Sequence, residues 1–140
     1  MADTPDTQQL QQLLDAALDA RERAYAPYSK FRVGAAVLDE HGHVHAGCNV
    51  ENAAYPQGLC AEGLALGAMV LAGGRRARAL LVLGEGLAPV TPCGGCRQKL
   101  REFGAEDTPV LVADSRGVRL RTTLGALLPQ AFGPDHLEAS

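Results

Sequence analysis

Two cysteine-led segments of the chain each continue into a helical pattern, a glycine and then an apolar run. The first is CAEGLALGAMVLAGG at residues 60–74, followed by ALLVLGE at 79–85. The second is CGGCRQKLREFG at 93–104, followed by PVLVAD at 109–114. The spacing and the terminal glycines predict two helices, and the apolar runs are typical of buried strands. The alternation restricts the fold to the α/β class, with helices packed on a sheet.

The N-terminal third is predicted to form a helix and a hairpin. Apolar residues recur at helical spacing from Leu10 to Leu18, behind a cap and first helical position at Thr4 and Pro5. FRVGAAVLDE and HGHVHAGCNV, residues 31–50, are interpreted as two strands around a His-Gly turn.

The whole chain is predicted to form one domain over residues 1–140. VRLRTTL, residues 118–124, adds a last strand, so the order α-β-β-α-β-α-β-β implies a mixed sheet with helices on it. A chain of 140 residues has the usual size of one domain, and no linker or repeat divides it. Only the tail after about Pro134 is expected to be loosely ordered.

Composition excludes several classes of function. A formal net charge of -3 without a block of Lys or Arg argues against a nucleic-acid partner. The beginning of the chain, MADTPDTQQLQQLL, lacks the pattern of an export signal, and no run of about 18 apolar residues predicts a membrane span. We therefore expect a cytoplasmic protein with reduced thiols that acts on a small polar ligand.

Three cysteines are candidate metal ligands. Cys60 and Cys93 each stand where an irregular segment enters a helix, and Cys96 lies one turn beyond Cys93 on the same helix face. Helix N-termini stabilise thiolates, and zinc takes sulfur ligands in tetrahedral geometry. Three protein ligands leave one coordination position open, which is typical of a catalytic zinc, whereas structural sites usually have four.

Other interpretations of the cysteines remain open at this point. The CxxC pair could be a redox pair, and a free cysteine is often a small apolar core residue. Cys48 could close the site as a fourth ligand, but strand alternation turns it away from Asn49 and Glu51, so we interpret it as core. The histidines around the hairpin turn are interpreted as solvated rather than coordinating: His41, His43 and His45.

Glu62 favours the catalytic interpretation. It lies on the first turn of a helix aimed at the proposed metal, where it could act on a zinc-bound water without being a ligand. A glutamate in a first helical turn is also common for electrostatic reasons alone. Together with the later cysteines, however, the pattern C-A-E…P-C-x-x-C matches the signature of zinc deaminases that act on cytosine or adenine rings.

The chain resembles the small, three-cysteine class of cytidine deaminases. The motifs are PYSKFRVGAAV, NVENAAYPQGLCAE, PCGGCRQKLREF and LLPQAFGPDHL, in that family's order and spacing over nearly the whole chain. The resemblance implies a three-layer α/β/α fold with a mixed five-stranded sheet, assembled as a homotetramer with four shared active sites. It also implies one zinc ion per subunit and hydrolysis of cytidine or deoxycytidine to uridine or deoxyuridine plus ammonia, a step of pyrimidine salvage.

The resemblance also assigns roles to residues. Cys60, Cys93 and Cys96 would hold zinc, and Glu62 would shuttle protons between water, N3 of the ring and the departing amine. The remaining predicted substrate contacts are Phe31, Asn49, Glu51, Ala53, Tyr55, Ala61 and Phe132.

These contacts divide by the part of the nucleoside that they would meet. Phe31 and Phe132 would stack on the pyrimidine, although by themselves such residues are more often packing anchors. Asn49 and Glu51 lie two apart in an extended segment and would bind the ribose 3′-hydroxyl, unless they only stabilise a loop. Phe132, Ala53 and Tyr55 would come from a neighbouring subunit, the last two near the 5′-hydroxyl.

Gly63 is a departure from the family pattern, because most relatives carry an arginine there that hydrogen-bonds the zinc thiolates. Three thiolates on a divalent zinc leave one negative charge, which would make the metal a poorer Lewis acid. Arg97, directly after Cys96, is the candidate to offset that charge, helped by the two helix N-termini. The alternative is that Arg97 is a surface or interface residue.

Two other functions compete with nucleoside deamination. A related enzyme could act on a cytosine-containing antibiotic such as blasticidin S, although Asn49, Glu51 and the Phe132 tail are nucleoside-like. A structural zinc or redox module that binds a partner protein is the alternative from a different class. The sequence does not distinguish cytidine from deoxycytidine as the preferred substrate.

Overall fold

The computed structural model describes residues 4–138. Its elements, in chain order, are α1 (Thr7–Glu22), β1 (Val33–Asp39), β2 (Val44–Cys48), the 3-10 turn η1 (Tyr55–Gln57), α2 (Ala61–Leu71), β3 (Ala77–Gly84), α3 (Gly94–Phe103), β4 (Pro109–Asp114), β5 (Gly117–Thr123), α4 (Leu124–Leu127) and the 3-10 turn η2 (Pro134–His136). None of the helices in this part of the chain combines the length and the apolar character needed to cross a membrane.

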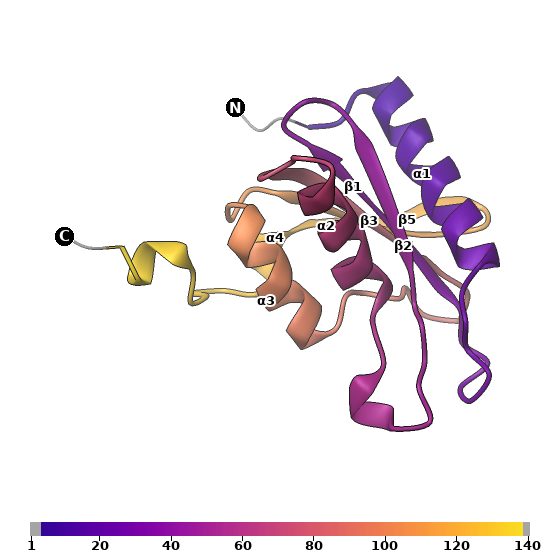
Figure 1. Ribbon diagram of the computed structural model, residues 1–140. Helices are drawn as coiled ribbons and strands as arrows, with labels where there is room; N and C mark the ends of the chain where they lie inside the picture. Colours follow the sequence, from indigo (N-terminus) through magenta and orange to yellow (C-terminus); the bar gives the residue numbers. More distant parts are fainter. Residues whose placement is uncertain (1–3, 139–140) are drawn as a thin grey trace.

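The sheet has five strands in the order β2-β1-β3-β4-β5. Strands β3 and β4 are parallel, and every other neighbouring pair is antiparallel, so β2, β3 and β4 run in one direction and β1 and β5 in the other. Helix α1 covers one face of the sheet, and α2 and α3 cover the other (Figure 1). The predicted α/β/α fold with a mixed five-stranded sheet is therefore confirmed.

The hydrophobic core lies on both faces of the central strands. Along β1, Ala35 and Val37 belong to the cluster under α2 and α3, whereas Ala36 and Leu38 belong to the cluster under α1. Strand β3 follows the same alternation, as expected from the period of two along a strand. Burial on both faces explains why these strands are continuous apolar runs in the sequence.

Helix α1 begins later than the sequence predicts. The cap is Asp6 rather than Thr4: the Gln9 amide donates to Asp6 Oδ1 at 2.7 Å, and the Asp6 amide donates to Gln9 Oε1 at 3.1 Å. This reciprocal capping box satisfies two backbone donors at once, and Thr4 and Pro5 precede it. Helix α4 was not predicted either, because four residues are too few to show helical periodicity.

Two glycines let helices lie directly on the hairpin. A Cβ at Gly34 would collide with the carbonyl oxygen of Ala17 in α1. A Cβ at Gly47 would be 2.5 Å from the carbonyl oxygen of Ala61 in α2. The missing side chain at Gly47 therefore sets the depth at which the first turn of α2 rests on β2.

The direction of the strands places the two cysteine-led helices at one edge of the sheet. Helix α2 follows β2, and α3 follows β3. Because β2 and β3 run in the same direction, the segments that follow them leave the sheet at the same edge. The N-termini of α2 and α3 lie at that edge. We call this the carboxyl edge, and the opposite edge, where β3 and β4 begin, the amino edge.

Candidate active site

Three thiols meet at the carboxyl edge. Cys60 is the N-cap of α2, Cys93 is the N-cap of α3, and Cys96 lies in the first turn of α3. Their sulfur atoms all lie within 4.8 Å of one another. Cys48, half-buried on β2, is not part of this group, so among the residues the structure describes the cluster has three sulfur donors rather than four.

The chemistry of these donors fits zinc. Burial raises the pKa of Cys60 and of Cys96, and the negative charges of Glu62 and the other thiols raise that of Cys96 further. The backbone amide of Cys96 lowers the pKa of Cys93 by hydrogen bonding. A divalent cation would offset the negative charge that three thiolates bring together, and soft sulfur at this spacing suits tetrahedral zinc.

Glu62 is buried beside the thiols, on the first turn of α2, with only 5% of its surface exposed. Burial raises the pKa of its carboxyl group, while its own backbone amide and the charge of Lys99 act in the opposite direction. A carboxyl group with a raised pKa can both accept and return a proton near neutral pH.

A cavity of about 430 Å³ lies in front of the thiols and Glu62. This volume is within the range of small-molecule sites. Its apolar walls include Val33 and Val90, which the sequence analysis did not single out. The predicted site residues that line it are Phe31, Asn49, Glu51, Tyr55, Cys60, Ala61, Glu62 and Cys93.

Asn49 ties the hairpin to the rim of this cavity. Its Oδ1 accepts a hydrogen bond from the Val33 amide at 2.9 Å, and its Nδ2 donates to the carbonyl oxygen of Phe31 at 2.8 Å. These two bonds hold Phe31, half-exposed, at the cavity. Asn49 keeps one further N–H, so a contact with a sugar hydroxyl stays a prediction.

Glu51 holds the loop before Phe31. Its Oε1 accepts hydrogen bonds from the amides of Tyr28 and Ser29, each at 3.0 Å, and its Oε2 accepts one from the Ser29 hydroxyl. The hydrogen bond from the Ser29 side chain is the largest cause that lowers the pKa of Glu51. The carboxylate therefore has a loop-stabilising role within one chain, and its predicted contact with ribose remains a prediction.

Three predicted contacts lie on segments that project from the body of the chain. Ala53 and Tyr55 belong to the exposed excursion between β2 and α2 (Figure 1). Phe132 is 55% exposed, stacks on His136 with ring centroids 5.0 Å apart, and lies on the C-terminal segment that extends away from the sheet (Figure 1). Phe132 is not among the lining residues of the cavity that the described part of one chain forms.

Arg97 anchors the loop that carries Cys93. Its Nε donates to the carbonyl oxygen of Pro92 at 2.7 Å, Nη1 to that of Leu127 at 2.9 Å, and Nη2 to Thr91 Oγ1 at 3.3 Å. Its hydrogen bonds with residues 4–138 thus go to oxygen atoms. The prediction that Arg97 offsets the thiolate charge is not tested by these contacts, but they give the side chain a positioning role.

The interpretation of His45 as solvated is wrong. Its side chain is only 11% exposed, and Nε2 lies 2.7 Å from Oδ2 of the buried Asp39. The Asp39 Oδ1 accepts hydrogen bonds from the amides of His41 and His43. The imidazole of His45 therefore helps close the hairpin at the amino edge, while the side chains of His41 and His43 are mostly exposed as expected.

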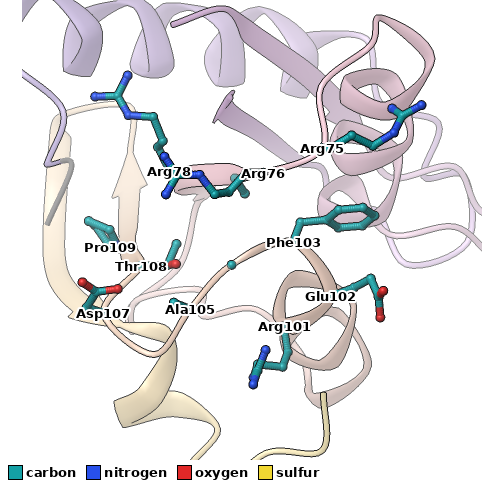
Figure 2. A pocket seen from close by; sticks show the side chains of 12 residues that line it. Arg75, Arg76, Arg78, Arg101, Glu102, Phe103, Ala105, Asp107, Thr108 and Pro109 are labelled. Atoms are coloured by element: carbon teal, nitrogen blue, oxygen red, sulfur yellow. The ribbon is translucent and has the colours of Figure 1, made fainter. Parts of the chain in front are cut away.

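A second cavity, of about 380 Å³, lies at the amino edge, and arginines dominate it (Figure 2). Arg75 Nη1 donates to the carbonyl oxygens of Val70 and Gly74, and Arg101 Nη2 lies 2.9 Å from Asp135 Oδ1. Arg76 and Arg78, near the start of β3, complete the group. Arg75 thus binds carbonyl groups at and just after the C-terminal end of α2, and the C-terminal end of α3 forms another wall of the cavity.

Comparison with known families agrees with the carboxyl-edge site. The family model described as "Cytidine and deoxycytidylate deaminase zinc-binding region" matches residues 7–112, which include Cys60, Glu62, Cys93 and Cys96. The chain belongs to the cytidine deaminase family. The three cysteines of this family member fit one zinc ion per subunit.

Several cytidine deaminases are similar over nearly the whole chain. That of Sporosarcina psychrophila is 44% identical over 128 residues, which cover 91% of this chain and 94% of the relative. That of Mycobacterium tuberculosis (strain ATCC 25618 / H37Rv) is 46% identical over 121 residues, which cover 86% of this chain and 87% of the relative. The crystal structure of cytidine deaminase from Burkholderia pseudomallei matches with a TM-score of 0.81 and 46% identity, over 87% of this chain and 98% of that one.

Proposed function

We propose that this protein is a zinc-dependent hydrolase that deaminates cytidine and deoxycytidine to uridine and deoxyuridine with release of ammonia. The observation that carries the proposal is the buried Glu62 beside three clustered thiols at a cavity of nucleoside size. The names of relatives with 43–46% identity support the same reaction. The family assignment disfavours a redox or purely structural zinc module.

Glu62 carries the proton transfers in this mechanism. Zinc held by Cys60, Cys93 and Cys96 supplies Lewis acidity, which makes water a nucleophile near neutral pH. Glu62 takes a proton from the attacking water and delivers it to N3 of the ring, while the new oxygen bond forms at C4. Glu62 then takes the proton of the new hydroxyl at C4 and delivers it to the amino group, which leaves as ammonia while the C4 carbonyl forms. Its burial and raised pKa suit a group that must exist in both protonation states.

The cavity walls would orient the nucleoside. Phe31 supplies a face for the pyrimidine, and Val33 and Val90 exclude water from the ring. Ala61, buried at the first position of α2, lies beside the reacting end of the cavity. Asn49 is proposed to use its free N–H for the ribose 3′-hydroxyl, with Glu51 next to it.

The active site is proposed to be shared between subunits of a homotetramer. Phe132, Ala53 and Tyr55 lie on exposed segments, and the exposed Phe132, which does not line its own chain's cavity, is suited to enter that of another chain. Tyr55 lines the cavity of its own chain and is proposed to reach that of a neighbour as well. In that arrangement Phe132 stacks on the pyrimidine, and Ala53 and Tyr55 approach the 5′-hydroxyl. One isolated chain would then lack part of its site.

The remaining assignments follow from the same chemistry. Arg97 is proposed to support the zinc site by fixing Pro92, the residue before Cys93. Residues 1–140 are proposed to form one domain, which the continuous sheet and the two core clusters support. Three reduced thiolates suit a reducing compartment, so we propose a cytoplasmic role in pyrimidine salvage, with no nucleic-acid or membrane partner.

A substrate comparison tests the proposal. Purified, zinc-loaded protein is incubated with cytidine, deoxycytidine and blasticidin S, and loss of the cytosine absorbance and release of ammonia are followed. The proposal predicts turnover of both nucleosides and much slower turnover of the antibiotic. Zinc-loaded protein that consumes neither nucleoside would contradict the proposed function.

A further inference from the structure

The proposed zinc site has a charge that the chain must offset. Three thiolates on a divalent ion leave one negative charge, and Cys96 is buried. An uncompensated negative charge of this kind weakens the metal as a Lewis acid and is costly to bury. Helix N-termini contribute partial charges, but a full cation close to the thiols offsets more.

Lys99 is the cation that reaches this end of α3. A Cβ built at Gly63 would lie 3.4 Å from Cδ and 3.6 Å from Cε of Lys99. A Cβ built at Gly95 would lie 3.7 Å from its Nζ. The lysine stem therefore lies against α2 at Gly63, and its ammonium group lies near Gly95. Gly95 belongs to the first turn of α3 and stands in the sequence between Cys93, the N-cap, and Cys96.

Helix geometry explains this direction. Side chains of an α-helix point toward its N-terminus, so Lys99 covers the turn that precedes its own Cα. That turn contains Cys96, three residues earlier. A Cβ at position 63 would be in ordinary van der Waals contact with this stem, so only a side chain longer than that of alanine would compete with it for space.

We propose that Lys99 is a positioning residue that offsets the negative charge of the zinc thiolates, with its stem lying against Gly63, where a side chain longer than a methyl group would compete for the same space. This inference rests on the proposed zinc site and adds a residue to it. It also assigns to Lys99 the charge role that the sequence pattern suggested for Arg97.

The other cations of α3 have oxygen partners. Arg97 donates to the three oxygen atoms of Pro92, Leu127 and Thr91. Arg101, at the other end of the helix, pairs with Asp135. The ion pairs described for residues 4–138 include none that joins Lys99 to a carboxylate. Its charge does act on the buried Glu62, whose pKa burial raises and Lys99 lowers in part, so the ammonium group faces the negative charges of the site rather than a surface pair.

Zinc affinity tests the charge role directly. Lys99→Met keeps most of the stem and removes the charge, Lys99→Arg keeps the charge, and Arg101→Met removes a cation from the same helix at the opposite end. Each protein competes with a chromophoric chelator for zinc in the absence of nucleoside. We expect Lys99→Met to bind zinc about 10- to 100-fold more weakly, the range for an outer partner of a metal ligand. Lys99→Arg and Arg101→Met should stay close to the wild type.

Salt separates a charge effect from a packing effect. Lys99 is exposed in one chain, so salt screens its interaction with the thiolates. The difference in zinc affinity between the wild type and Lys99→Met should shrink as salt is raised, whereas a loss of packing would be independent of salt. A thermal unfolding midpoint for each variant checks that the fold is retained.

A double variant with substitutions at positions 63 and 99 gives a second test. Gly63→Arg should restore zinc affinity to Lys99→Ala, because the new guanidinium takes the space that the lysine stem leaves. Folded Lys99→Met protein with wild-type zinc affinity at low salt would overturn the proposal. A folded Gly63→Arg/Lys99→Ala protein that binds zinc no more tightly than Lys99→Ala would also overturn it. Wild-type protein that binds zinc but does not deaminate cytidine would instead refute the proposed function and leave the role of Lys99 standing.

Discussion

The carboxyl and amino edges of the sheet each carry a cavity, but their chemistry is opposite. At the carboxyl edge, the N-termini of α2 and α3 meet three thiols and the buried Glu62. At the amino edge, the C-terminal end of α3 meets a group of arginines (Figure 2). Helix α3 spans both edges, so the polarity of one helix helps to assign anions to one end and cations to the other.

The amino edge also contains polar contacts that close the β1–β2 hairpin and fix the start of β3. Asp39 accepts three hydrogen bonds there, and the Glu40 carboxylate accepts hydrogen bonds from the amides of Arg75 and Arg76. Substitution of Glu62 or the thiols at the carboxyl edge should therefore change activity, whereas substitution of Asp39 at the amino edge should change stability.

Glu62→Gln gives the largest expected effect. An amide cannot accept and return a proton, and general acid-base catalysis contributes about 10² to 10⁴ in rate. We expect turnover of cytidine to fall by at least this factor while zinc content stays at the wild-type level. The matched control is Glu102→Gln on α3, which lines the amino-edge cavity and should keep its activity. Near-normal turnover by Glu62→Gln would remove Glu62 from the mechanism.

Asp39→Asn should change stability rather than chemistry. Burial alone would raise the pKa of Asp39, but the hydrogen bonds from His45 and from the amides of His43 and His41 together lower it. Removing the charge should cost about 1–3 kcal/mol in the free energy of unfolding, measured with urea at pH 7. The control is His43→Gln, whose ring is mostly exposed.

The pH dependence of this difference has a definite sign. A carboxyl group with a lowered folded-state pKa stabilises the fold above its unfolded-state pKa, near 3.8, and loses that contribution as the pH falls through the folded value. The difference in the free energy of unfolding between the wild type and Asp39→Asn should therefore become smaller in acid. If this difference in unfolding free energy stays constant from pH 7 into acid, the charge of Asp39 does not contribute to stability.

Phe132→Ala should have the smallest of these effects. Loss of one aromatic contact is worth about 0.5–1.5 kcal/mol beyond area burial, which corresponds to a rise in KM of about 2- to 12-fold. The control is Leu137→Ala, also exposed on the C-terminal segment. Wild-type activity should also fall on dilution, once light scattering shows that subunits separate. A fully active monomer would contradict the shared site.

The elements and the metal ligands could be predicted from the sequence because their signals are local. Each cysteine-led helix has its apolar period, its stop glycine and a following apolar strand within about 25 residues of chain. The direction of β2 and β3 then brings Cys60 close to Cys93 and Cys96, as the motif implied.

Other parts of the site could not be predicted because they depend on contacts between distant residues. The stem of Lys99 lies against Gly63, which is 36 residues earlier in the sequence. The carboxylate of Glu51 accepts a hydrogen bond from Ser29, which is 22 residues earlier. His45 was misinterpreted because its partner, Asp39, faces it only when the hairpin forms. The cap at Asp6 was missed because Thr4 and Asp6 are both acceptable capping residues, and only geometry selects one.

Metal removal tests the central claim most directly. Purified protein is assayed for cytidine deamination, stripped with a chelator, and assayed again after zinc is added back, with zinc per chain measured at each step. The account predicts that turnover falls in proportion to zinc content and returns as zinc approaches one ion per chain. Unchanged cytidine turnover by protein shown to be free of metal would contradict a zinc-dependent active site at the carboxyl edge.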